Sequence, residues 1–295
     1  MKPAPFEYHV PNSLGQALEL LYDRGPEAKL LAGGQSLVPA MNFRVVQPSA
    51  LIDLNHVEEL DHINKEDKKN LRIGAMTRER KLEFDPVVAK WVPLLAEAMP
   101  FVAHPQIRNR GTLGGSLANA DPAAELPVIM VALEARLKAA SKSGERWIEA
   151  PSFFSGMFST DLAPDEMLVE IELPAMPERT GWSFMEIAPR AGDYALMGAA
   201  VILTLDERGA CQRPHIVFLN AGDGPVEAKE ASRLLVGEVI KEDAIESAAT
   251  MASEKEIDPY GNIHASAAFQ RHLARVLTRR TLTKALERAQ KGFVQ

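Results

Sequence analysis

Residues 28–37 read AKLLAGGQSL, a short apolar run that ends in a pair of glycines. The run predicts a buried strand, and the glycine pair predicts a tight turn directly after it. The preceding residues 13–23 predict a helix, because Ser13 and Gln16 have the spacing of a capping box. A helix, a strand and a glycine pair in this order predict a turn whose main chain is exposed.

A second glycine-rich segment, GTLGGSLAN, covers residues 111–119. Glycines let main-chain N–H groups point at an anion without a clash from a Cβ atom, and the hydroxyls of Ser36, Thr112 and Ser116 can add donors. Two such segments suit a pyrophosphate, which carries more charge than one loop easily neutralises. Neither matches the GxGxxG fingerprint or the P-loop. The residues alone leave two interpretations open, a phosphate site or two ordinary turns at strand ends.

The composition excludes several classes of protein. The chain has 295 residues, of which 46% are hydrophobic and 25% charged, as is typical of a globular protein. Its net charge of −7 disfavours nucleic acid as the main partner. No apolar run reaches the roughly 18 residues of a membrane span. The N-terminal segment lacks an apolar signal core, so we expect a cytoplasmic protein.

Cysteine and histidine usage argues against a metal centre on this chain. Cys211 is the single cysteine, so the chain has no internal disulfide and no cysteine-ligated iron–sulfur cluster. The seven histidines show no metal-binding spacing. We predict no metal ligands on this chain. Redox chemistry on this chain would require an organic cofactor.

The succession of strand-like and helical runs is interrupted at residues 174–177, which contain two prolines. We place a domain boundary there. Before the boundary, residues 85–98 predict a single helix with Pro86 near its start. After it, three strand-like runs are followed by helical segments, the last over about residues 267–289. The three runs cover residues 183–187, 198–205 and 216–220.

Two further residues have more than one interpretation. Glu125 lies in the segment DPAAE that follows the second glycine-rich segment, where a helix start would direct N–H groups at the same anion. Glu125 can accept from a ribose or a ring N–H group, or it is an ordinary acidic residue in the first turn of that helix. Tyr194 can cover an aromatic ring such as a flavin, or it packs at a strand end.

The segments taken together resemble a known family, the FAD-binding medium subunits of molybdenum hydroxylases. This group includes the medium chain of aerobic carbon monoxide dehydrogenase and its relatives for N-heterocycles, and the flavin segment of xanthine dehydrogenase is similar. The resemblance covers essentially the whole chain, and the motifs are specific because they occur together and in order. They are AGGQS at residues 32–36, GTLGGS at 111–116, NADPAAELP at 119–127 and GDY at 192–194.

The resemblance implies an α+β fold. Residues 1–176 would form a PCMH-type (vanillyl-alcohol-oxidase-like) FAD-binding domain with subdomains over about 1–56 and 57–176. Residues 177–295 would form a C-terminal domain of the carbon monoxide dehydrogenase flavoprotein type. The family pattern for this second domain is a three-stranded antiparallel sheet with a helical bundle.

The resemblance also implies a set of residues that bind FAD non-covalently. In the family the two glycine-rich segments surround the FAD diphosphate. Ser116, Asn119 and Glu125 would line the flavin and ribitol region, Leu168 would pack on the cofactor, and Tyr194 would lie near the isoalloxazine ring. Relatives carry Asp at the Glu125 position, His at the Gln35 position and Lys at the Glu186 position, so Glu186 is given no flavin contact. The implied set is Lys29, Ala32, Gly33, Gly34, Gln35, Ser36, Leu37, Gly111, Thr112, Leu113, Gly114, Gly115, Ser116, Asn119, Glu125, Leu168 and Tyr194.

The implied function is electron transfer in a dimer of heterotrimers. A large subunit would carry the molybdenum cofactor, and a small subunit two [2Fe–2S] clusters that reduce FAD on this chain. The electrons would then pass to an external acceptor. Because this role is electron transfer, the resemblance implies no acid–base or nucleophilic catalytic residue on this chain. One alternative is a stand-alone PCMH-type flavin oxidase acting on a small molecule. Such enzymes often tether the flavin through His or Cys near the first glycine-rich segment, and residues 29–42 contain neither. Another alternative is a scaffold subunit without flavin.

Overall fold

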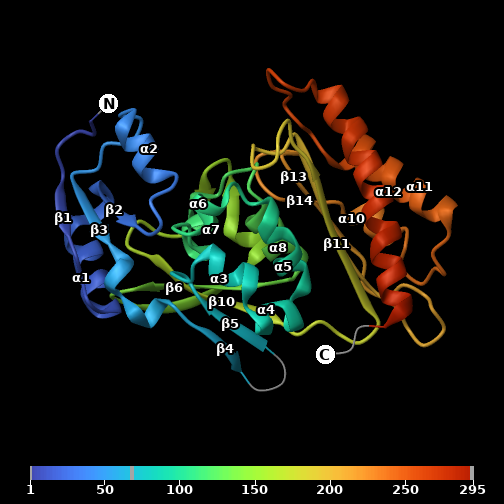
Figure 1. The fold of residues 1–295 in the computed structure, drawn as a ribbon, viewed down its shortest axis with the longest axis horizontal. Coiled ribbons are helices and arrows are strands. Elements are labelled where there is room, and N and C mark those ends of the chain that lie inside the picture. Colours follow the sequence, from blue (N-terminus) through green and yellow to red (C-terminus); the bar gives the residue numbers. More distant parts are fainter. Residues whose placement is uncertain (1, 67–69, 293–295) are drawn as a thin grey trace.

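A small parallel sheet carries the first glycine-rich segment. Its layer contains β1 (Glu7–His9), α1 (Leu14–Arg24), η1 (Gly25–Glu27), β2 (Ala28–Leu31), α2 (Leu37–Asn42), β3 (Ala50–Asp53), η2 (Leu54–His56) and η3 (Glu58–Leu60). The structure, a computed structural model, describes residues 2–66 and 70–292 (Figure 1). The strand order is β1-β3-β2. The predicted helix and strand are confirmed, and the Ser13 side chain accepts from the Gln16 amide at 3.3 Å. Because β2 and β3 run parallel, their carboxyl ends meet at one sheet edge, beside the glycine pair.

A five-stranded antiparallel sheet forms the centre of the molecule, in the order β4-β5-β10-β6-β7. Its strands are β4 (Ile63–Glu66), β5 (Asn70–Gly74), β6 (Arg136–Ser141), β7 (Gly144–Glu149) and β10 (Met167–Pro174). Helices cover one face of this sheet (Figure 1). They are α3 (Glu79–Phe84), α4 (Pro86–Trp91), α5 (Pro93–Ala98), η4 (Met99–Phe101), α6 (Pro105–Arg108), α7 (Leu113–Asn119) and α8 (Glu125–Ala132). The short elements α9 (Ala150–Phe153), β8 (Phe154–Gly156) and β9 (Ser159–Thr160) follow β7.

The C-terminal domain is an antiparallel sheet covered on one face by helices. Its elements are β11 (Thr180–Ile187), β12 (Met197–Thr204), β13 (His215–Leu219), β14 (Val226–Glu227), α10 (Lys229–Arg233), α11 (Glu242–Met251), η5 (Ala252–Glu256) and α12 (Ala267–Lys291). The long α12 packs across β11 and β12 (Figure 1). No helix in the described part of the chain combines the length and the apolar character needed to cross a bilayer.

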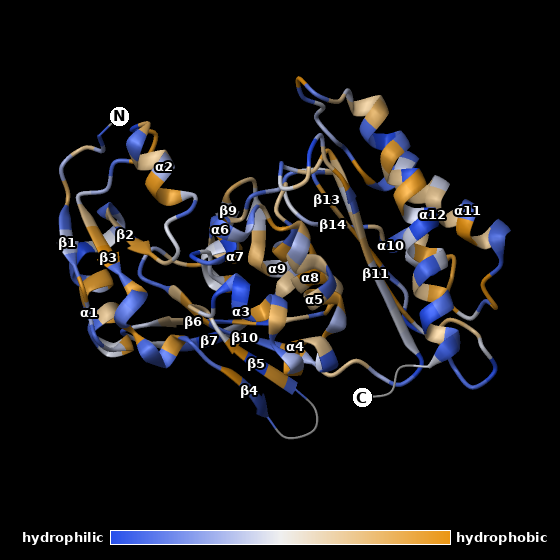
Figure 2. Cartoon of the chain, in the orientation of Figure 1, coloured by the Kyte–Doolittle hydropathy of each residue, from blue (hydrophilic) through white to orange (hydrophobic). Residues whose placement is uncertain are grey.

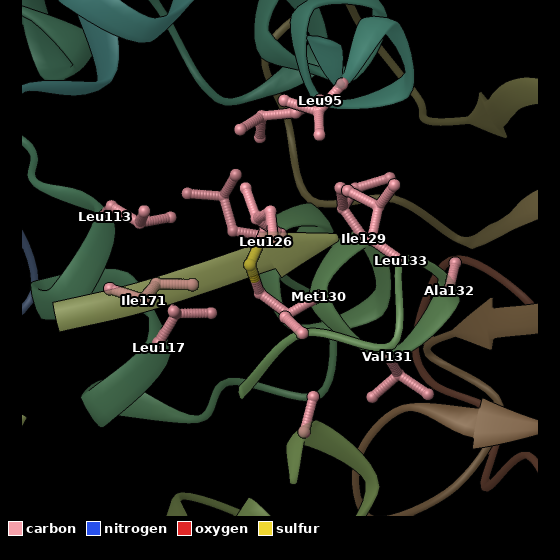
Figure 3. Packing of buried hydrophobic residues seen from close by; sticks show 14 of the residues in the cluster. Leu95, Leu113, Leu117, Leu126, Ile129, Met130, Val131, Ala132, Leu133 and Ile171 are labelled. Atoms are coloured by element: carbon pink, nitrogen blue, oxygen red, sulfur yellow. The ribbon is translucent and has the colours of Figure 1, made fainter. Parts of the chain in front are cut away.

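The helix α8 joins the two domains through one hydrophobic core. All eight of its residues are buried, because it lies between the central sheet and the C-terminal sheet. Figure 2 shows hydrophobic colour along α5 and α8. Figure 3 shows Leu126 and Met130 of α8 near Ile171 of β10 and Leu117 of α7. The same cluster includes residues of the second domain, namely Phe184, Ala200, Val217 and Leu219.

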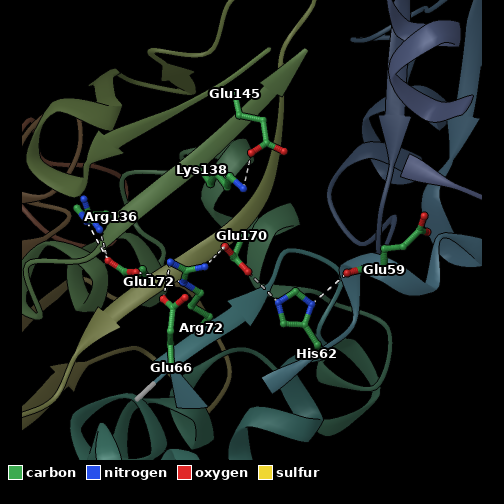
Figure 4. Close-up of polar contacts among 9 residues, drawn as sticks. All are labelled: Glu59, His62, Glu66, Arg72, Arg136, Lys138, Glu145, Glu170 and Glu172. Atoms are coloured by element: carbon green, nitrogen blue, oxygen red, sulfur yellow. Dashed lines mark hydrogen bonds and ion pairs between the residues drawn. The ribbon is translucent and has the colours of Figure 1, made fainter. Parts of the chain in front are cut away.

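The opposite face of the central sheet is polar, since side chains alternate along each strand. At its centre the Glu172 carboxylate accepts from Arg72 at 3.2 Å and from Arg136 Nε at 2.9 Å (Figure 4). Burial disfavours ionisation of Glu172, but these two guanidinium groups outweigh it and lower the pKa of the carboxyl. His62 and Glu170 continue the network through a contact of 3.1 Å. Charge pairing on this face therefore connects β5, β10 and β6, and His62 extends it to the residue before β4.

Two sequence predictions need correction. The C-terminal sheet has four strands, not three, because Val226–Glu227 pairs with β13 as β14. Two residues are too short to show the alternation that identifies a strand. The predicted single helix over residues 85–98 is two helices, α4 and α5, separated at Val92. Pro93 lacks an N–H group and begins a new helix instead of continuing the first.

We expect Gly181→Ala to destabilise the C-terminal domain. A Cβ atom at Gly181 of β11 would lie 1.8 Å from the Ala285 carbonyl oxygen of α12. Separating helix and strand to relieve such overpacking costs about 1–3 kcal/mol or more. The control is Gly15→Ala in α1, where a Cβ atom would meet nothing within 4 Å. Thermal unfolding should show a lower Tm for Gly181→Ala and an unchanged or slightly higher one for the control. Equal melting temperatures would contradict the proposed close packing.

Candidate functional site

The two glycine-rich segments lie against each other. A Cβ atom at Gly33 would be 2.4 Å from the Arg110 carbonyl oxygen and 2.8 Å from the Cα atom of Gly111. A Cβ atom at Gly115 would be 3.2 Å from the Cβ atom of Ala32. Only glycine permits backbones to approach this closely. Segments nearly 80 positions apart in the sequence therefore form one site.

The first segment leaves a run of main-chain donors free. Within the described structure, the N–H groups of residues 33–36 donate no hydrogen bond to the protein. Gly34 has a φ of 73°, in the left-handed region, and the Gln35 side chain donates back to the Gly33 carbonyl at 3.1 Å. Consecutive free N–H groups in such a turn make a cradle for an anion. This matches the exposed turn predicted from the sequence.

The second segment is different, because most of its N–H groups are already bonded. The expectation that both segments present free donors therefore holds for the first and is wrong for most of the second. The second segment instead supplies close backbone packing and buries Leu113 in the core. Its hydrogen bonds run from Gly111 N to Ile107 O, Leu113 N to Thr77 O, Gly114 N to Ala75 O, Gly115 N to Thr112 Oγ1 and Ser116 N to Thr112 O.

A pocket of about 420 Å³ opens beside the first segment. Arg78 connects two of the residues that line it, because its guanidinium donates to Asn55 Oδ1 at 2.5 Å and also to the Arg110 carbonyl. Asn55 in turn donates to the Ala32 carbonyl at 3.0 Å. The pocket is lined by Tyr8, Leu31, Ala32, Gly33, Gly34, Gln35, Val38, Pro39, Asp53, Asn55 and Arg110.

Several of these lining residues were not predicted from the sequence. Asp53 ends the buried strand β3 and Asn55 follows it, and their position at the end of a strand parallel to β2 was the signal that could have placed them here. Tyr8 donates a hydrogen bond to Asp53. Burial disfavours the ionised form of Asp53, but the hydrogen bonds from Tyr8 and Asn55 have the larger effect. The pKa of the Asp53 carboxyl is therefore lowered. Arg78 and Arg110 had no local signal, since only the fold brings them to this pocket.

A cluster of buried carboxyl groups lies at the second segment. Burial, together with the neighbouring Glu125, raises the pKa of Glu79 to about 8 and that of Glu186 to about 8. Burial and Asp121 raise the pKa of Glu125 to about 7. The Glu79 carboxylate occupies the space that a side chain at Gly111 would need. One oxygen each of Glu79 and Glu186 has no hydrogen-bond partner. Near neutral pH these groups can keep their protons and act as donors.

The remaining predicted residues are spread around these two places. Tyr194, on the connection between β11 and β12, is 71% exposed. Partial burial and the nearby carboxylates Asp121 and Glu125 raise the pKa of its phenol. Ser116 and Asn119 are half-buried on α7, and Leu168 is 6% exposed in β10. The structure thus groups Tyr194 with Glu125. It brings residues 32–35 together with 110–115, whereas Lys29 and Leu37 flank the pocket without lining it.

No cluster in the described residues has the composition of a metal site. No group of three or more His, Cys, Asp or Glu side chains there could hold a metal ion. Cys211 is buried, and this burial raises the pKa of its thiol to about 12. A thiol in this state is a poor metal ligand and a poor nucleophile.

Comparison with known proteins shows the family of this chain. Residues 4–176 match the family described as "FAD binding domain in molybdopterin dehydrogenase". Residues 182–285 match "CO dehydrogenase flavoprotein C-terminal domain". The chain belongs to the FAD-binding medium subunits of molybdenum hydroxylases. It is an oxidoreductase flavoprotein subunit of the molybdenum-dependent dehydrogenase type, and the resemblance seen in the sequence is confirmed.

Similar medium subunits match the chain over nearly its full length. The 6-hydroxypseudooxynicotine dehydrogenase complex subunit alpha of Paenarthrobacter nicotinovorans is 45% identical, covering 98% of this chain and 97% of its own. The carbon monoxide dehydrogenase medium chain of Hydrogenophaga pseudoflava is 36% identical, and the match covers 98% of this chain and 99% of that one. Among solved structures, a carbon monoxide dehydrogenase from Hydrogenophaga pseudoflava gives a TM-score of 0.94 at 37% identity, covering 97% and 99%. Quinoline 2-oxidoreductase from Pseudomonas putida 86 gives a TM-score of 0.92 at 41% identity, and the match covers 97% of this chain and 99% of that one.

The site fits the diphosphate of FAD. The free N–H groups of residues 33–36 form a cradle, and glycine at Gly33 and Gly115 lets the second segment pack directly against it. Arg110 adds a positive charge to the pocket wall. The medium subunit therefore has a suitable anion site in the first segment.

We expect Gly33→Ala to weaken FAD binding about ten- to a hundredfold, because its Cβ atom would force the two segments apart at a cost of about 1–3 kcal/mol. The measurement is the FAD dissociation constant, from quenching of flavin fluorescence by the purified chain. Gly15→Ala, outside the site, is the control and should bind FAD as the wild type does. Wild-type affinity in Gly33→Ala would show that the contact between the segments does not matter for binding.

The buried carboxyl groups predict a pH dependence. Glu79 has a higher pKa when folded than when unfolded, so its protonated form favours the fold. This contribution is complete near pH 4.5 and is lost as the pH rises to about 8. For the FAD-free chain, we expect the Tm of Glu79→Gln to fall less than that of the wild type between these pH values. The exposed Glu58→Gln is the control. Parallel Tm profiles for Glu79→Gln and the wild type would count against the burial effect.

Proposed function

We propose that this chain is the FAD-carrying electron-transfer subunit of a heterotrimeric molybdenum hydroxylase. It receives electrons from two [2Fe–2S] clusters on a small partner subunit and passes them to an external acceptor. A large partner subunit carries the molybdenum cofactor and the substrate, and the assembly is a dimer of heterotrimers. The observation that carries this proposal is the run of free N–H groups at residues 33–36, held against a second glycine-rich segment. The cytoplasmic location stays a prediction from the sequence.

The residues of this chain have three tasks toward FAD. Residues 32–37 bind the diphosphate, chiefly with the main-chain donors of 33–36, and residues 111–115 pack against them and support this segment, with Lys29 beside it. Ser116, Asn119 and Glu125 line the flavin and ribitol region. Leu168 and Tyr194 provide apolar and aromatic contact. Bound FAD supplies the ability to exchange electrons, and the protein supplies its position and its electrostatic surroundings.

The cysteine content of this chain supports the placement of the iron–sulfur clusters on a partner subunit. Its single cysteine, Cys211, is buried, so an iron–sulfur cluster would have to reside on a partner. The names of similar proteins refer to carbon monoxide, caffeine, nicotine and glyceraldehyde, although the compared chains are similar throughout. This variety supports a medium subunit that does not choose the substrate.

The test is to purify the chain alone and with its partner subunits, and to record visible spectra before and after heat release. We expect an FAD spectrum that heat releases into solution, because residues 29–42 contain no His or Cys for a covalent tether. We also expect substrate to reduce the flavin only when the partners are present. Reduction of the lone chain by a small molecule would favour a stand-alone oxidase. A chain that stays colourless with added FAD and partners would support a scaffold subunit.

A further inference from the structure

Two amide side chains hold the segment that carries Tyr194. Asn220 follows β13, and Gln270 lies in the first turn of α12 with only 2% of its surface exposed. Both donate to the same acceptor, the Leu196 carbonyl, from Asn220 Nδ2 at 3.2 Å and from Gln270 Nε2 at 3.0 Å. Asn220 Nδ2 also donates to the Ala195 carbonyl at 2.8 Å. The two residues directly after Tyr194 are thus fixed by their main-chain oxygens.

The main chain of Asn220 ties this segment to the acidic segment of the site. Its N–H group donates to the Pro122 carbonyl at 2.8 Å, between Asp121 and Glu125 in the sequence. Asn220 has a φ of 55°, in the left-handed region that asparagine tolerates better than most residues. One residue therefore bonds to both sides of the region where Tyr194 and Glu125 meet.

Gln270 extends the connection to a third loop. Its Oε1 accepts from the Gly261 N–H group at 2.9 Å, and its Nε2 also approaches the Asn220 carbonyl at 3.4 Å. Every one of these partners is a main-chain atom. A buried amide that is fully bonded to main chains fixes loop positions, and removing it leaves buried groups without partners.

Tyr194 depends on this arrangement, because its own side chain makes no hydrogen bond among the described residues and is 71% exposed. The position of its main chain therefore sets which places the ring can reach. At the other end of the segment Gly192 packs on the His104 ring, where a Cβ atom would lie 2.3 Å from His104 Nδ1. The segment is therefore held at both ends.

We propose that Asn220 and Gln270 are positioning residues that set the place of Tyr194 in the flavin site. The inference rests on the proposed function, since it takes Tyr194 to lie beside bound FAD. The two amides act through Tyr194 and do not touch the cofactor themselves.

The test uses the complete complex with three variants. Gln270→Leu removes the amide and keeps the size of the side chain. Asn220→Gly removes the side-chain donor and keeps the left-handed backbone. Gln212→Leu is the matched control, because the side chain of this exposed glutamine in the same domain donates only to Asp206. The readouts are FAD content, the visible circular dichroism of the flavin and its midpoint potential.

We expect Gln270→Leu and Asn220→Gly to keep FAD but to change both the dichroism and the potential, whereas Gln212→Leu changes neither. In a Tyr194→Leu background, Gln270→Leu should have no further effect, because its influence passes through Tyr194. Unchanged flavin properties in Gln270→Leu, or an equal change with and without Tyr194, would overturn the proposal.

A second measurement separates this inference from the proposed function. In the chain without FAD, Gln270→Leu should speed hydrogen exchange of the peptide over residues 190–196 by about tenfold, since hydrogen bonds that hold the segment are lost. Absence of flavin from the wild-type complex would defeat the proposed function only. Unchanged exchange in Gln270→Leu would defeat the positioning role.

Discussion

Gly33 and the Arg110–Gly111 main chain approach more closely than any side chain would permit, and this contact determines the shape of the site. It brings the end of a parallel strand against the start of α7, and the core beneath the parallel sheet also includes Met76 and Val169 from the segments that follow it. Arg78 and Asn55 secure the contact with hydrogen bonds to both sides. The N–H groups of residues 33–36 remain available, and the nearby carbonyls accept from other donors, Arg110 O from Arg78 and Gly111 O from the Glu79 N–H group.

The two parts of the site differ in charge. The pocket beside the first segment has main-chain donors and Arg110, which favour an anion. The region near Glu125 holds carboxyl groups whose burial favours their protonated forms. A dinucleotide such as FAD has the matching polarity, with a diphosphate in its middle and a hydrogen-bonding ring at its end. The charge of each region, as well as its shape, would thus determine which part of FAD lies in it.

The sequence predicted the local features better than the contacts between them. The capping box at Ser13, the strand before Gly33 and the long α12 follow from periodicity and capping, which act over a few residues. The split at Pro93 and the short β14 were missed, because one depends on a local break and the other on pairing with a distant strand. The family motifs pointed to both glycine-rich segments. They did not indicate Arg78, Asn55 or the buried Glu79, whose roles arise only when distant segments meet.

The shared core around α8 has a consequence for how such chains diverge. Side chains of the second domain, among them Phe184 and Val217, belong to the same packed cluster as Ile129 of α8. Close packing makes every such neighbour sensitive to changes in the others. A gene fusion that joined residues 1–176 of this chain to the C-terminal domain of a relative would therefore mismatch a buried interface. A substitution on the buried face of one domain therefore limits which residues fit on the facing side of the other.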